Sequence, residues 1–402
     1  MAKINTDQVK IQEILTRGVE NIYPNKEYLK KLLSSGKQLS LYLGIDPTGP
    51  SLHLGHAINL EKLRQFQALG HKIILLIGDF TGTVGDPTDK SAVRKALTRA
   101  EVLNNARDYK KQASRVLNFS GNNKAEIKFN STWQNKMNFA QVLDVAKNFT
   151  VQRLLERDMF QERLKSARPI YLHEFMYPVL QAYDCVAMGV DGELGGNDQT
   201  FNMLAGRELM KTLKNKEKFV ITMKLLTDSS GKKMGKTENN MAALSDTPQD
   251  MFGKIMSWTD NMIVPGFELC TRVAISEIKQ IEKDLKSGKN PRDLKFTLAM
   301  EIVEIYFGEN AAQKAGQEFT NIFAKKENPL DIPEFAIKTG KINPADLLML
   351  MSLVGSKSEA RRLVDGGGMK INHAKIAAWD KDIEIKSGDV VQAGKRKFGK
   401  VK

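Results

Sequence analysis

The spacing of apolar and polar positions predicts a buried strand, a tight turn and a helix within residues 39–70. The run LYLGI has the length and residue types of a buried strand, DPTGP follows as a turn, and the remainder is apolar at helical spacing up to Gly70. A second apolar strand, KIILLI, ends in a Gly-rich loop that carries Asp86. Strand, helix and strand in this order predict a right-handed parallel unit with its ligand at the carboxyl ends of the strands.

The pattern elsewhere is mainly helical. Residues 1–35 carry an apolar stripe and predict helix, and residues 98–175 predict a helical insertion with one short strand candidate, AEIKFNS. FVITMKLL at 219–226 predicts the last strand of the sheet. We therefore expect an α/β protein with a Rossmann-like parallel-sheet domain over 1–246, its helical insertion at about 98–175, and an all-α domain over 247–327.

The C-terminal part differs from the rest in composition. Residues 328–342 contain two prolines, and with Pro344 just beyond they predict a linker before a small α+β domain over 343–402. Residues 341–402 hold 13 Lys and Arg against 7 Asp and Glu, so the positive charge is concentrated there. The whole chain has 402 residues, 41% of them hydrophobic, and a formal net charge of +14. This length suits two or three domains, and the charge favours a polyanionic partner.

Cysteine content and the N-terminal sequence bear on the cellular compartment. Two cysteines, Cys185 and Cys270, provide neither a disulfide framework nor zinc spacing. The stretch MAKINTDQVKIQEIL lacks the uninterrupted apolar core of a signal peptide, and the longest apolar runs have the length of strands. We expect a cytoplasmic protein without membrane association.

Two histidines near the start of the predicted helix are candidates for binding phosphate. His53 and His56 lie three residues apart on one helical face, with Gly55 between them. A helix N-terminus offers unpaired N–H groups and partial positive charge, and a glycine surface lets a flat ring lie against the backbone. Packed structural histidines remain an alternative. A metal site is not expected, because no third ligand has suitable spacing.

A polar stripe on an otherwise apolar helix is a candidate amino-acid site. The segment YPVLQAYD places Tyr177, Gln181 and Asp184 at positions i, i+4 and i+7. A solvated helix face is the alternative, but the neighbouring residues are apolar. Buried polar groups need partners, and a polar ligand would provide them.

Two motifs resemble those of class I aminoacyl-tRNA synthetases. DPTGPSLHLGH resembles their HIGH signature, and GKKMGKT resembles their KMSKS loop, with Gly235 and Thr237 where serine is usual. The resemblance implies catalytic roles for His53 and His56 and, in the catalytic loops, for Lys233, Lys236, Thr237, Lys90 and Arg94. The substrate carboxylate would attack the α-phosphate of ATP, so the protein needs to align it and stabilise the developing charge rather than supply a nucleophile.

The polar helix resembles the tyrosine-recognition helix of tyrosyl-tRNA synthetases. The resemblance implies a tyrosine-binding set consisting of Tyr42, Asp86, Tyr177, Gln181, Asp184 and Gln199. It implies an ATP-binding set consisting of Gly44, Asp46, Thr48, His53, Gly55, His56, Gly196, Asp198 and Lys236. The string GGNDQ supplies the residues from 195 to 199, with Asn197 where the family more often has Ser or Thr.

The basic tail resembles an RNA-binding module first named for a ribosomal small-subunit protein, and we expect an S4-like domain. A short helix with Arg361 and Arg362, followed by β-hairpins that end in KRKFGK with Lys395, Arg396 and Lys397, would form a basic face for phosphate contacts. A charged, partly disordered tail is the alternative.

Together these features resemble a tyrosyl-tRNA synthetase of the bacterial type. The resemblance implies L-tyrosine, ATP with accompanying Mg²⁺, and tRNA(Tyr) as partners, and a homodimer whose contact uses the insertion. It implies no dedicated protein metal site. Two alternatives remain: another class I synthetase, such as one that activates tryptophan, and a non-catalytic RNA-binding protein on the same scaffold.

Overall fold

The computed structural model describes residues 4–87, 97–227, 241–324, 332–394 and 397–402. The chain divides into two units, one formed by residues 1–246 and 254–309, the other by residues 247–253 and 310–402. Each unit contains a buried apolar cluster of its own. The domain boundaries expected from the sequence stay predictions.

The first unit is built on a six-stranded sheet with the strand order β1-β6-β5-β2-β3-β4. The strands are β1 (Val19–Tyr23), β2 (Ser40–Ile45), β3 (Lys72–Ile77), β4 (Glu126–Phe129), β5 (Gly192–Gly196) and β6 (Phe219–Met223). β1 runs antiparallel to β6, and all other neighbours in the sheet are parallel. The predicted α/β fold with a parallel sheet is confirmed, including the strands expected from AEIKFNS and FVITMKLL.

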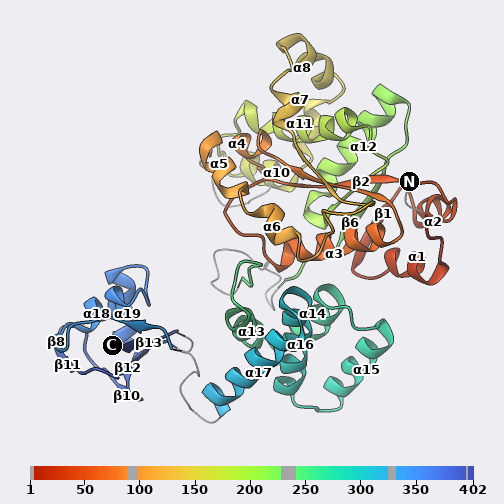
Figure 1. Ribbon diagram of the computed structural model, residues 1–402. Helices are drawn as coiled ribbons and strands as arrows, with labels where there is room; N and C mark the ends of the chain where they lie inside the picture. The colour runs from red at the N-terminus through yellow and green to blue at the C-terminus, as the bar shows by residue number, and fades with distance from the viewer. Residues whose placement is uncertain (1–3, 88–96, 228–240, 325–331, 395–396) are drawn as a thin grey trace. The chain divides into compact units, whose positions relative to one another are not determined.

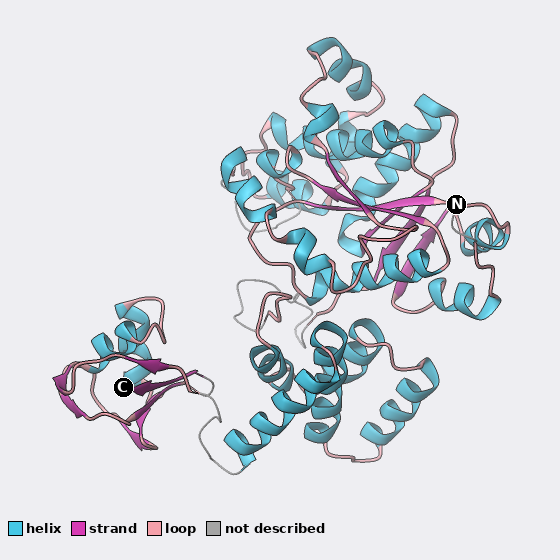
Figure 2. Ribbon diagram, viewed as in Figure 1, coloured by secondary structure: helices cyan, strands magenta, loops and turns pink. Residues whose placement is uncertain are grey.

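Helices cover both faces of this sheet (Figures 1 and 2). α3 (Leu54–Ala68) packs on one face, and α11 (Leu172–Met188) and α12 (Thr200–Lys214) pack on the other. Successive strand residues point to opposite faces. Tyr42 on β2 therefore joins Ile74 and Leu76 of β3 in the apolar cluster under α11 and α12. This alternation turns the Tyr42 side chain toward the helix that carries the predicted amino-acid contacts.

The prediction of helix throughout residues 1–35 is wrong in the middle of that range. α1 (Gln8–Ile14) and α2 (Lys26–Ser34) are separated by strand β1. Gly18 adopts a φ of +64°, a left-handed conformation that glycine accommodates easily, and the chain then enters the sheet beside β6. The partner of β1 is about 200 residues away in sequence. Local periodicity therefore cannot indicate that these two segments pair.

Short helices connect β3 to α11. They are α4 (Thr81–Val84), α5 (Arg99–Ala106), α6 (Tyr109–Ala113), α7 (Ser131–Gln134), α8 (Phe139–Ala146), α9 (Val151–Leu155) and α10 (Asp158–Lys165). β4 lies between α6 and α7 and forms the edge of the sheet next to β3. The carboxyl end of β4 therefore comes to the same side as that of β3.

A helical segment follows the sheet within the first unit. It consists of the 3₁₀ helix η3 (Asp260–Met262), α14 (Ile263–Cys270), α15 (Ile275–Lys286) and α16 (Pro291–Phe307). α14 contacts both α16 and α3. A Cβ atom at Gly266 would lie 2.7 Å from Leu298, so the glycine permits the close approach of α14 and α16.

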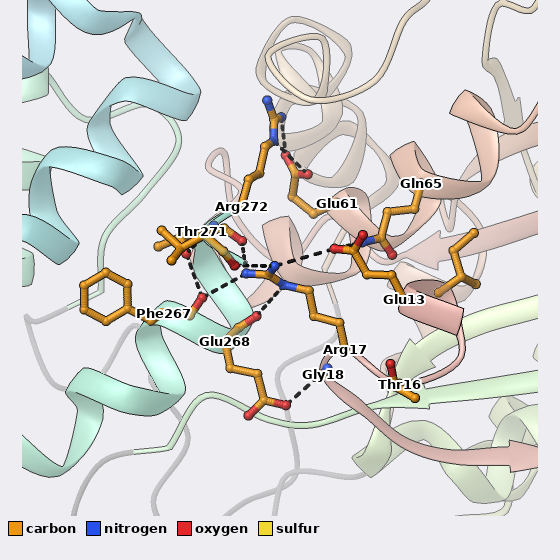
Figure 3. Close-up of polar contacts among 12 residues, drawn as sticks. Glu13, Thr16, Arg17, Gly18, Glu61, Gln65, Phe267, Glu268, Thr271 and Arg272 are labelled. Atoms are coloured by element: carbon orange, nitrogen blue, oxygen red, sulfur yellow. Dashed lines mark hydrogen bonds and ion pairs between the residues drawn. The ribbon is translucent and has the colours of Figure 1, made fainter. Parts of the chain in front are cut away.

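Arg17 connects the N-terminal segment to the end of α14 (Figure 3). Its buried guanidinium donates hydrogen bonds to the carbonyl oxygens of Phe267, Glu268, Thr271 and Val273 at 2.6–3.1 Å. The last carbonyls of a helix have no partners within the helix, and a cation is favourable at that end. Arg17 therefore caps α14 from a segment that lies about 250 positions earlier in the sequence.

The second unit contains the C-terminal tail and residues from two helices, α13 (Pro248–Met256) and α17 (Glu309–Ala324), which flank residues 260–307 in the sequence. Phe252 of α13 and Phe319 of α17 have ring centroids 5.4 Å apart. The tail contains α18 (Pro344–Leu350), α19 (Lys357–Asp365), β7 (Glu334–Phe335), β8 (Gly340–Ile342), β9 (Met369–Ile371), β10 (Ala374–Lys375), β11 (Ile383–Ile385), β12 (Val390–Ala393) and β13 (Lys397–Val401).

The tail strands form a five-stranded sheet, β10-β9-β12-β13-β7, and a β11-β8 pair around an apolar core. The helix that carries Arg361 and Arg362 and the hairpin that ends the chain are both present as expected. The described residues of the segment predicted as a linker include two short strands, because β7 pairs with β13 and β8 pairs with β11. Pro333 precedes β7, and Pro344 follows β8 at the start of α18, so neither proline needs to donate within these strands.

Candidate active site

A pocket of about 590 Å³ opens at the carboxyl ends of the parallel strands in the first unit. Its walls come from β2, from β5 and η1 (Asn197–Gln199), from α11, and from the start of α3. The described residues of both predicted binding sets line this pocket: Tyr42, Gly44, Asp46, Thr48, His53, Gly55, His56, Asp86, Tyr177, Gln181, Asp184, Gly196, Asp198 and Gln199. The position agrees with the rule for open parallel sheets, and the roles of these residues stay predictions.

Several predicted residues lie outside the described part of the chain. These are Lys90, Arg94, Lys233, Lys236, Thr237, Lys395 and Arg396. The residues that flank the 228–240 gap can be located. Leu225 and Leu226 line the pocket before the gap, and after it Ala243 forms an antiparallel bridge with His53. The chain after residue 240 is therefore close to the start of α3, and the chain before residue 228 lies at the pocket.

The start of α3 arranges its two histidines in contact. The backbone N–H of His53 donates to Nδ1 of His56 at 3.2 Å, and the ring centroids are 3.9 Å apart. Because Nδ1 accepts, His56 carries its ring proton on Nε2 in this arrangement. A Cβ atom at Gly55 would lie 2.9 Å from Cε1 of His53, so only glycine leaves this surface unobstructed.

Asp184 is buried and accepts three side-chain hydrogen bonds. The donors are Nε1 of Trp133 at 2.7 Å, Nε2 of Gln134 at 2.9 Å and Nδ2 of Asn130 at 3.2 Å. Burial raises the pKa of Asp184 to about 7, although the three donors favour the ionised form and oppose this rise. The carboxyl group therefore changes charge near neutral pH.

The three donors to Asp184 were not predicted from the sequence. They belong to NSTWQ, which directly follows β4. Their position after a strand could have indicated a place in the site, because polar residues that follow parallel strands meet at the same edge of a sheet. The 98–175 segment was instead predicted to be mostly helical, so this position was not considered.

Tyr42 extends from β2 into the same region. Its side chain is buried, and its hydroxyl makes no hydrogen bond of normal geometry to any described residue. Burial raises the pKa of Tyr42 well above its usual value, and the nearby Glu193 and Asp184 carboxylates raise it further. The phenol is therefore neutral, and a buried hydroxyl without a partner suits a polar ligand group.

Tyr177 and Asp46 are linked directly. The Tyr177 hydroxyl donates to Oδ2 of Asp46 at 2.9 Å, and the Thr81 hydroxyl donates to Oδ1 at 2.7 Å. Gly78, which sequence reasoning did not select, makes room for this carboxylate, since a Cβ atom there would lie 1.9 Å from Oδ1. Asp46 thus connects the helix of the predicted tyrosine set to the turn of the predicted ATP set.

Asp86 lies between two side chains from later in the chain. Nε2 of Gln199 donates to Oδ2 of Asp86 at 2.8 Å, and the buried Arg157 forms an ion pair with Oδ1 at 3.3 Å. Nδ2 of Asn202 donates to Oε1 of Gln199 at 2.9 Å, which fixes the orientation of that amide. Arg157 was missed because nothing in its local sequence distinguishes it from a solvated helix residue.

The basic residues of the tail differ in their surroundings. Arg361 and Arg362 are exposed on α19, and the guanidinium of Arg361 lies 4.2 Å from the ring centroid of Trp379. Lys397 begins β13, and its ammonium group donates to the carbonyl oxygen of Leu353 at 2.9 Å. All three residues are exposed, and the Lys397 ammonium already has a backbone acceptor.

Within residues 4–87, 97–227, 241–324, 332–394 and 397–402, no three His, Cys, Asp or Glu side chains gather as metal ligands would. Over those same ranges no helix combines the length and apolar character required to span a membrane.

Comparison with known proteins gives consistent matches. Residues 34–324 match the family described as tRNA synthetases class I (W and Y). A tyrosine--tRNA ligase of Moorella thermoacetica is 43% identical over 404 aligned positions, which cover 99% of this chain and 97% of the relative. A tyrosine--tRNA ligase of Haemophilus influenzae is 44% identical, with coverage of 100% and 98%.

Solved structures show the same architecture. A C-terminally truncated mitochondrial tyrosyl-tRNA synthetase of Coccidioides posadasii aligns with a TM-score of 0.62 and 25% identity, covering 77% of this chain and 92% of the other. The tyrosyl-tRNA synthetase of Archaeoglobus fulgidus complexed with L-tyrosine has a similar fold, with a TM-score of 0.59, 22% identity and coverage of 77% and 100%. The family match over most of the chain, with relatives above 40% identity over almost its full length, means that the chain belongs to the class I tRNA synthetases of the W and Y type, in the tyrosine--tRNA ligase family.

Proposed function

We propose that the chain activates L-tyrosine with ATP and transfers it to the 3′ end of tRNA(Tyr). The observation that carries this choice of amino acid is the pairing of a buried acceptor, Asp184, with the unpartnered hydroxyl of Tyr42 in one pocket. A phenolic hydroxyl can donate to the carboxylate and also accept from the second hydroxyl. Phenylalanine would leave the Tyr42 hydroxyl unpaired and would bring no donor to Asp184, and the indole N–H of tryptophan, which can only donate, would leave Tyr42 unpaired.

The other end of the amino acid has suitable partners in the same pocket. Tyr177, Gln181 and Asp86 form a polar group for the ammonium, and Gln199 is available to the carboxyl group. Oε1 of Gln181 is buried and accepts no hydrogen bond from any described residue, so it is a ready acceptor for an ammonium donor. This arrangement supports recognition of a free amino acid.

The nucleotide would bind from the turn after β2 to the start of α3. Gly44, Asp46, Thr48 and the His53–His56 segment line this side of the pocket. Gly196 and Asp198 line it from η1, where Asp198 suits the ribose hydroxyls. The partial positive charge at the start of α3 and the two imidazoles favour bound phosphate.

The first chemical step needs alignment more than a protein nucleophile. A tyrosine carboxylate oxygen forms a bond to the α-phosphorus of ATP, and the bond to pyrophosphate breaks. Donors at the start of α3 stabilise the charge on the phosphoryl oxygens, and we assign the same task to Lys233, Lys236 and Thr237 and to Lys90 and Arg94. Mg²⁺ would accompany ATP through its phosphates, with no protein cage required.

Transfer to tRNA would use the parts of the chain that follow the catalytic sheet. We assign anticodon binding to the helical segment 247–327 and additional RNA contacts to an S4-like domain over 343–402, with Arg361, Arg362, Lys395, Arg396 and Lys397 as its basic residues. The concentration of positive charge in the tail supports this assignment, because phosphate contacts dominate such affinity.

An exposed apolar surface supports a homodimer that uses the insertion. Phe139 and Leu172 are 76% and 79% exposed, and Leu143, Val151 and Leu164 of the same insertion are also more than half exposed. Large exposed apolar side chains gathered in one segment favour an interface with another chain. The two unpaired cysteines suit a reducing compartment, which supports the cytoplasm as the location.

The direct test is exchange of labelled pyrophosphate into ATP with each of the twenty amino acids. We expect exchange that depends on tyrosine and is negligible with tryptophan or phenylalanine. Lys233→Ala and Lys236→Ala should slow this exchange more than they weaken tyrosine binding, since their contacts strengthen in the transition state. Absence of exchange with every amino acid, together with RNA binding, would favour the non-catalytic alternative.

A further inference from the structure

Glu193 and Lys218 form an ion pair inside the first unit, beside the amino-acid pocket. Their exposed fractions are 3% and 0%. Nζ of Lys218 donates to Oε2 of Glu193 and also to the carbonyl oxygen of Met203 at 3.2 Å. Neither residue belongs to the tyrosine or ATP set described above.

The strand register brings this pair against the pocket. Glu193 of β5 is directly opposite Tyr42 of β2, so both side chains emerge on the face covered by α11 and α12. Lys218 precedes β6, the next strand of the sheet, and reaches the same face. Glu193 itself lines the pocket, whereas Lys218 lies behind it.

The space around the lysine depends on a specific residue of α12. A Cβ atom at Gly206 would lie 2.9 Å from Nζ of Lys218 and 3.2 Å from Sγ of Cys185. The missing side chain thus leaves room for the ammonium group. Stability gives little reason for such a pair, because desolvation of two charges is costly and apolar replacements are often as stable.

The second oxygen of Glu193 contacts a predicted ammonium ligand. Nε2 of Gln181 donates to Oε1 of Glu193 at 3.4 Å. An ionised carboxylate can only accept, so it selects the amide orientation in which the Gln181 NH₂ group faces Glu193 and Oε1 faces elsewhere. That Oε1 atom is the buried acceptor without a partner among the described residues.

We infer that the Glu193–Lys218 pair is a positioning device that holds the Gln181 amide with its oxygen toward the ammonium group of the amino acid. In the ion pair with Lys218, the Glu193 carboxylate accepts hydrogen bonds and has none to donate. A neutral group at position 193 could donate to Gln181, and the amide could then turn its NH₂ group toward the ammonium, where both would be donors. The inference rests on the proposed function, in which Gln181 contacts the ammonium.

The test compares two ligands that differ only in the ammonium group. Dissociation constants for L-tyrosine and for 3-(4-hydroxyphenyl)propionate are measured by calorimetry on the full chain. We expect Glu193→Gln to weaken L-tyrosine binding about tenfold, as expected for loss of a hydrogen bond to a charged group, and to leave the analogue almost unchanged. The double variant Glu193→Gln/Lys218→Met should show the same selective loss without an unpaired buried charge, so it replaces the single variant if that one fails to fold.

Lys216→Met is the matched control. It makes the same chemical change two residues earlier, in a partly exposed ion pair with Asp191, and should affect neither ligand. Equal weakening of both ligands in the double variant, or no weakening of either, would overturn the positioning role. A wild-type protein that binds both ligands equally would instead refute Gln181 as an ammonium contact and with it this inference, whereas the proposed function is tested separately by pyrophosphate exchange.

Discussion

The indole Nε1–H of Trp133 donates to Oδ1 of Asp184 at 2.7 Å. This hydrogen bond joins α7, which follows the edge strand β4, to α11 on the face of the sheet. It fixes one carboxylate oxygen of the residue that we assign to the phenolic hydroxyl of tyrosine. The inserted segment therefore helps to shape the amino-acid pocket.

Trp133→Phe should weaken tyrosine binding. The variant keeps an aromatic ring but removes a donor to a charged group, which costs roughly 1.5–3 kcal/mol when the acceptor stays buried. Asp184 should then titrate at a still higher pH. Trp258→Phe is a matched control, because Nε1 of Trp258 is buried without a hydrogen-bond partner in the described chain. Calorimetric titration with tyrosine measures both variants, and equal dissociation constants would contradict the role of Trp133.

The pKa of Asp184 predicts opposite pH dependences for stability and for tyrosine binding. Its pKa rises from 3.8 to about 7 in the folded state, so the folded protein binds one more proton than the unfolded chain between these values. Relative to Asp184→Asn, the wild type should lose about 1.4 kcal/mol of unfolding free energy per unit as pH rises through this window. Tyrosine binding, which uses the ionised acceptor, should instead strengthen as pH rises through about 7.

Urea unfolding and tyrosine titrations from pH 4.5 to 8 measure these two trends. Asp184→Asn cannot ionise at this position, so its tyrosine affinity should vary less with pH than that of the wild type. Parallel stability profiles for the two proteins would show that Asp184 titrates at its ordinary pKa.

Arg17→Lys should destabilise the first unit. A lysine retains the charge but cannot reproduce the planar fork that donates to Phe267, Glu268 and Thr271 at once (Figure 3). Buried carbonyls left unpaired cost about 1–3 kcal/mol each, and we expect a loss of roughly 3 kcal/mol in the free energy of unfolding. Arg64→Lys is the control, since Arg64 forms a partly exposed pair with Glu61 on α3 and should lose less than about 1 kcal/mol. Urea unfolding at fixed pH compares them.

A charge on the exposed apolar surface should disrupt the proposed dimer. Phe139→Asp would desolvate a carboxylate in an interface without a partner, so light scattering should show a shift from dimer to monomer. Leu350→Asp places the same charge at another exposed leucine, in the tail, and should not change the oligomeric state. A wild type that is monomeric at micromolar concentration would refute the dimer itself.

The sequence predicted those parts of the fold and site that depend on local order. The strand, turn and helix from Leu39 to Gly70 follow from apolar spacing and turn residues, and the structure has β2 and α3 there. The strand β1 was not predicted, because its partner, β6, is distant in sequence. Its burial pattern also lacks a clear alternation. Local pattern therefore located the centre of the site but not every strand of the sheet.

The residues that support the site were harder to predict than those that line it. Tyr177, Gln181 and Asp184 share one helix, so their spacing is visible in the sequence. Trp133 and Glu193 meet that helix only through the order and register of the sheet strands. Contacts of this kind depend on tertiary structure, and no short window of sequence contains both partners.

Discrimination between tyrosine and phenylalanine in adenylate formation tests the central claim most directly. The measurement is the ratio of kcat/KM for the two amino acids in pyrophosphate exchange, for the wild type, Tyr42→Phe and Asp184→Asn. We predict a strong wild-type preference for tyrosine that falls roughly 10–100-fold in Asp184→Asn and less in Tyr42→Phe, because a hydrogen bond to a charged acceptor is worth more than one to a hydroxyl. An unchanged ratio in both variants would contradict the assignment of this pocket to the tyrosine side chain.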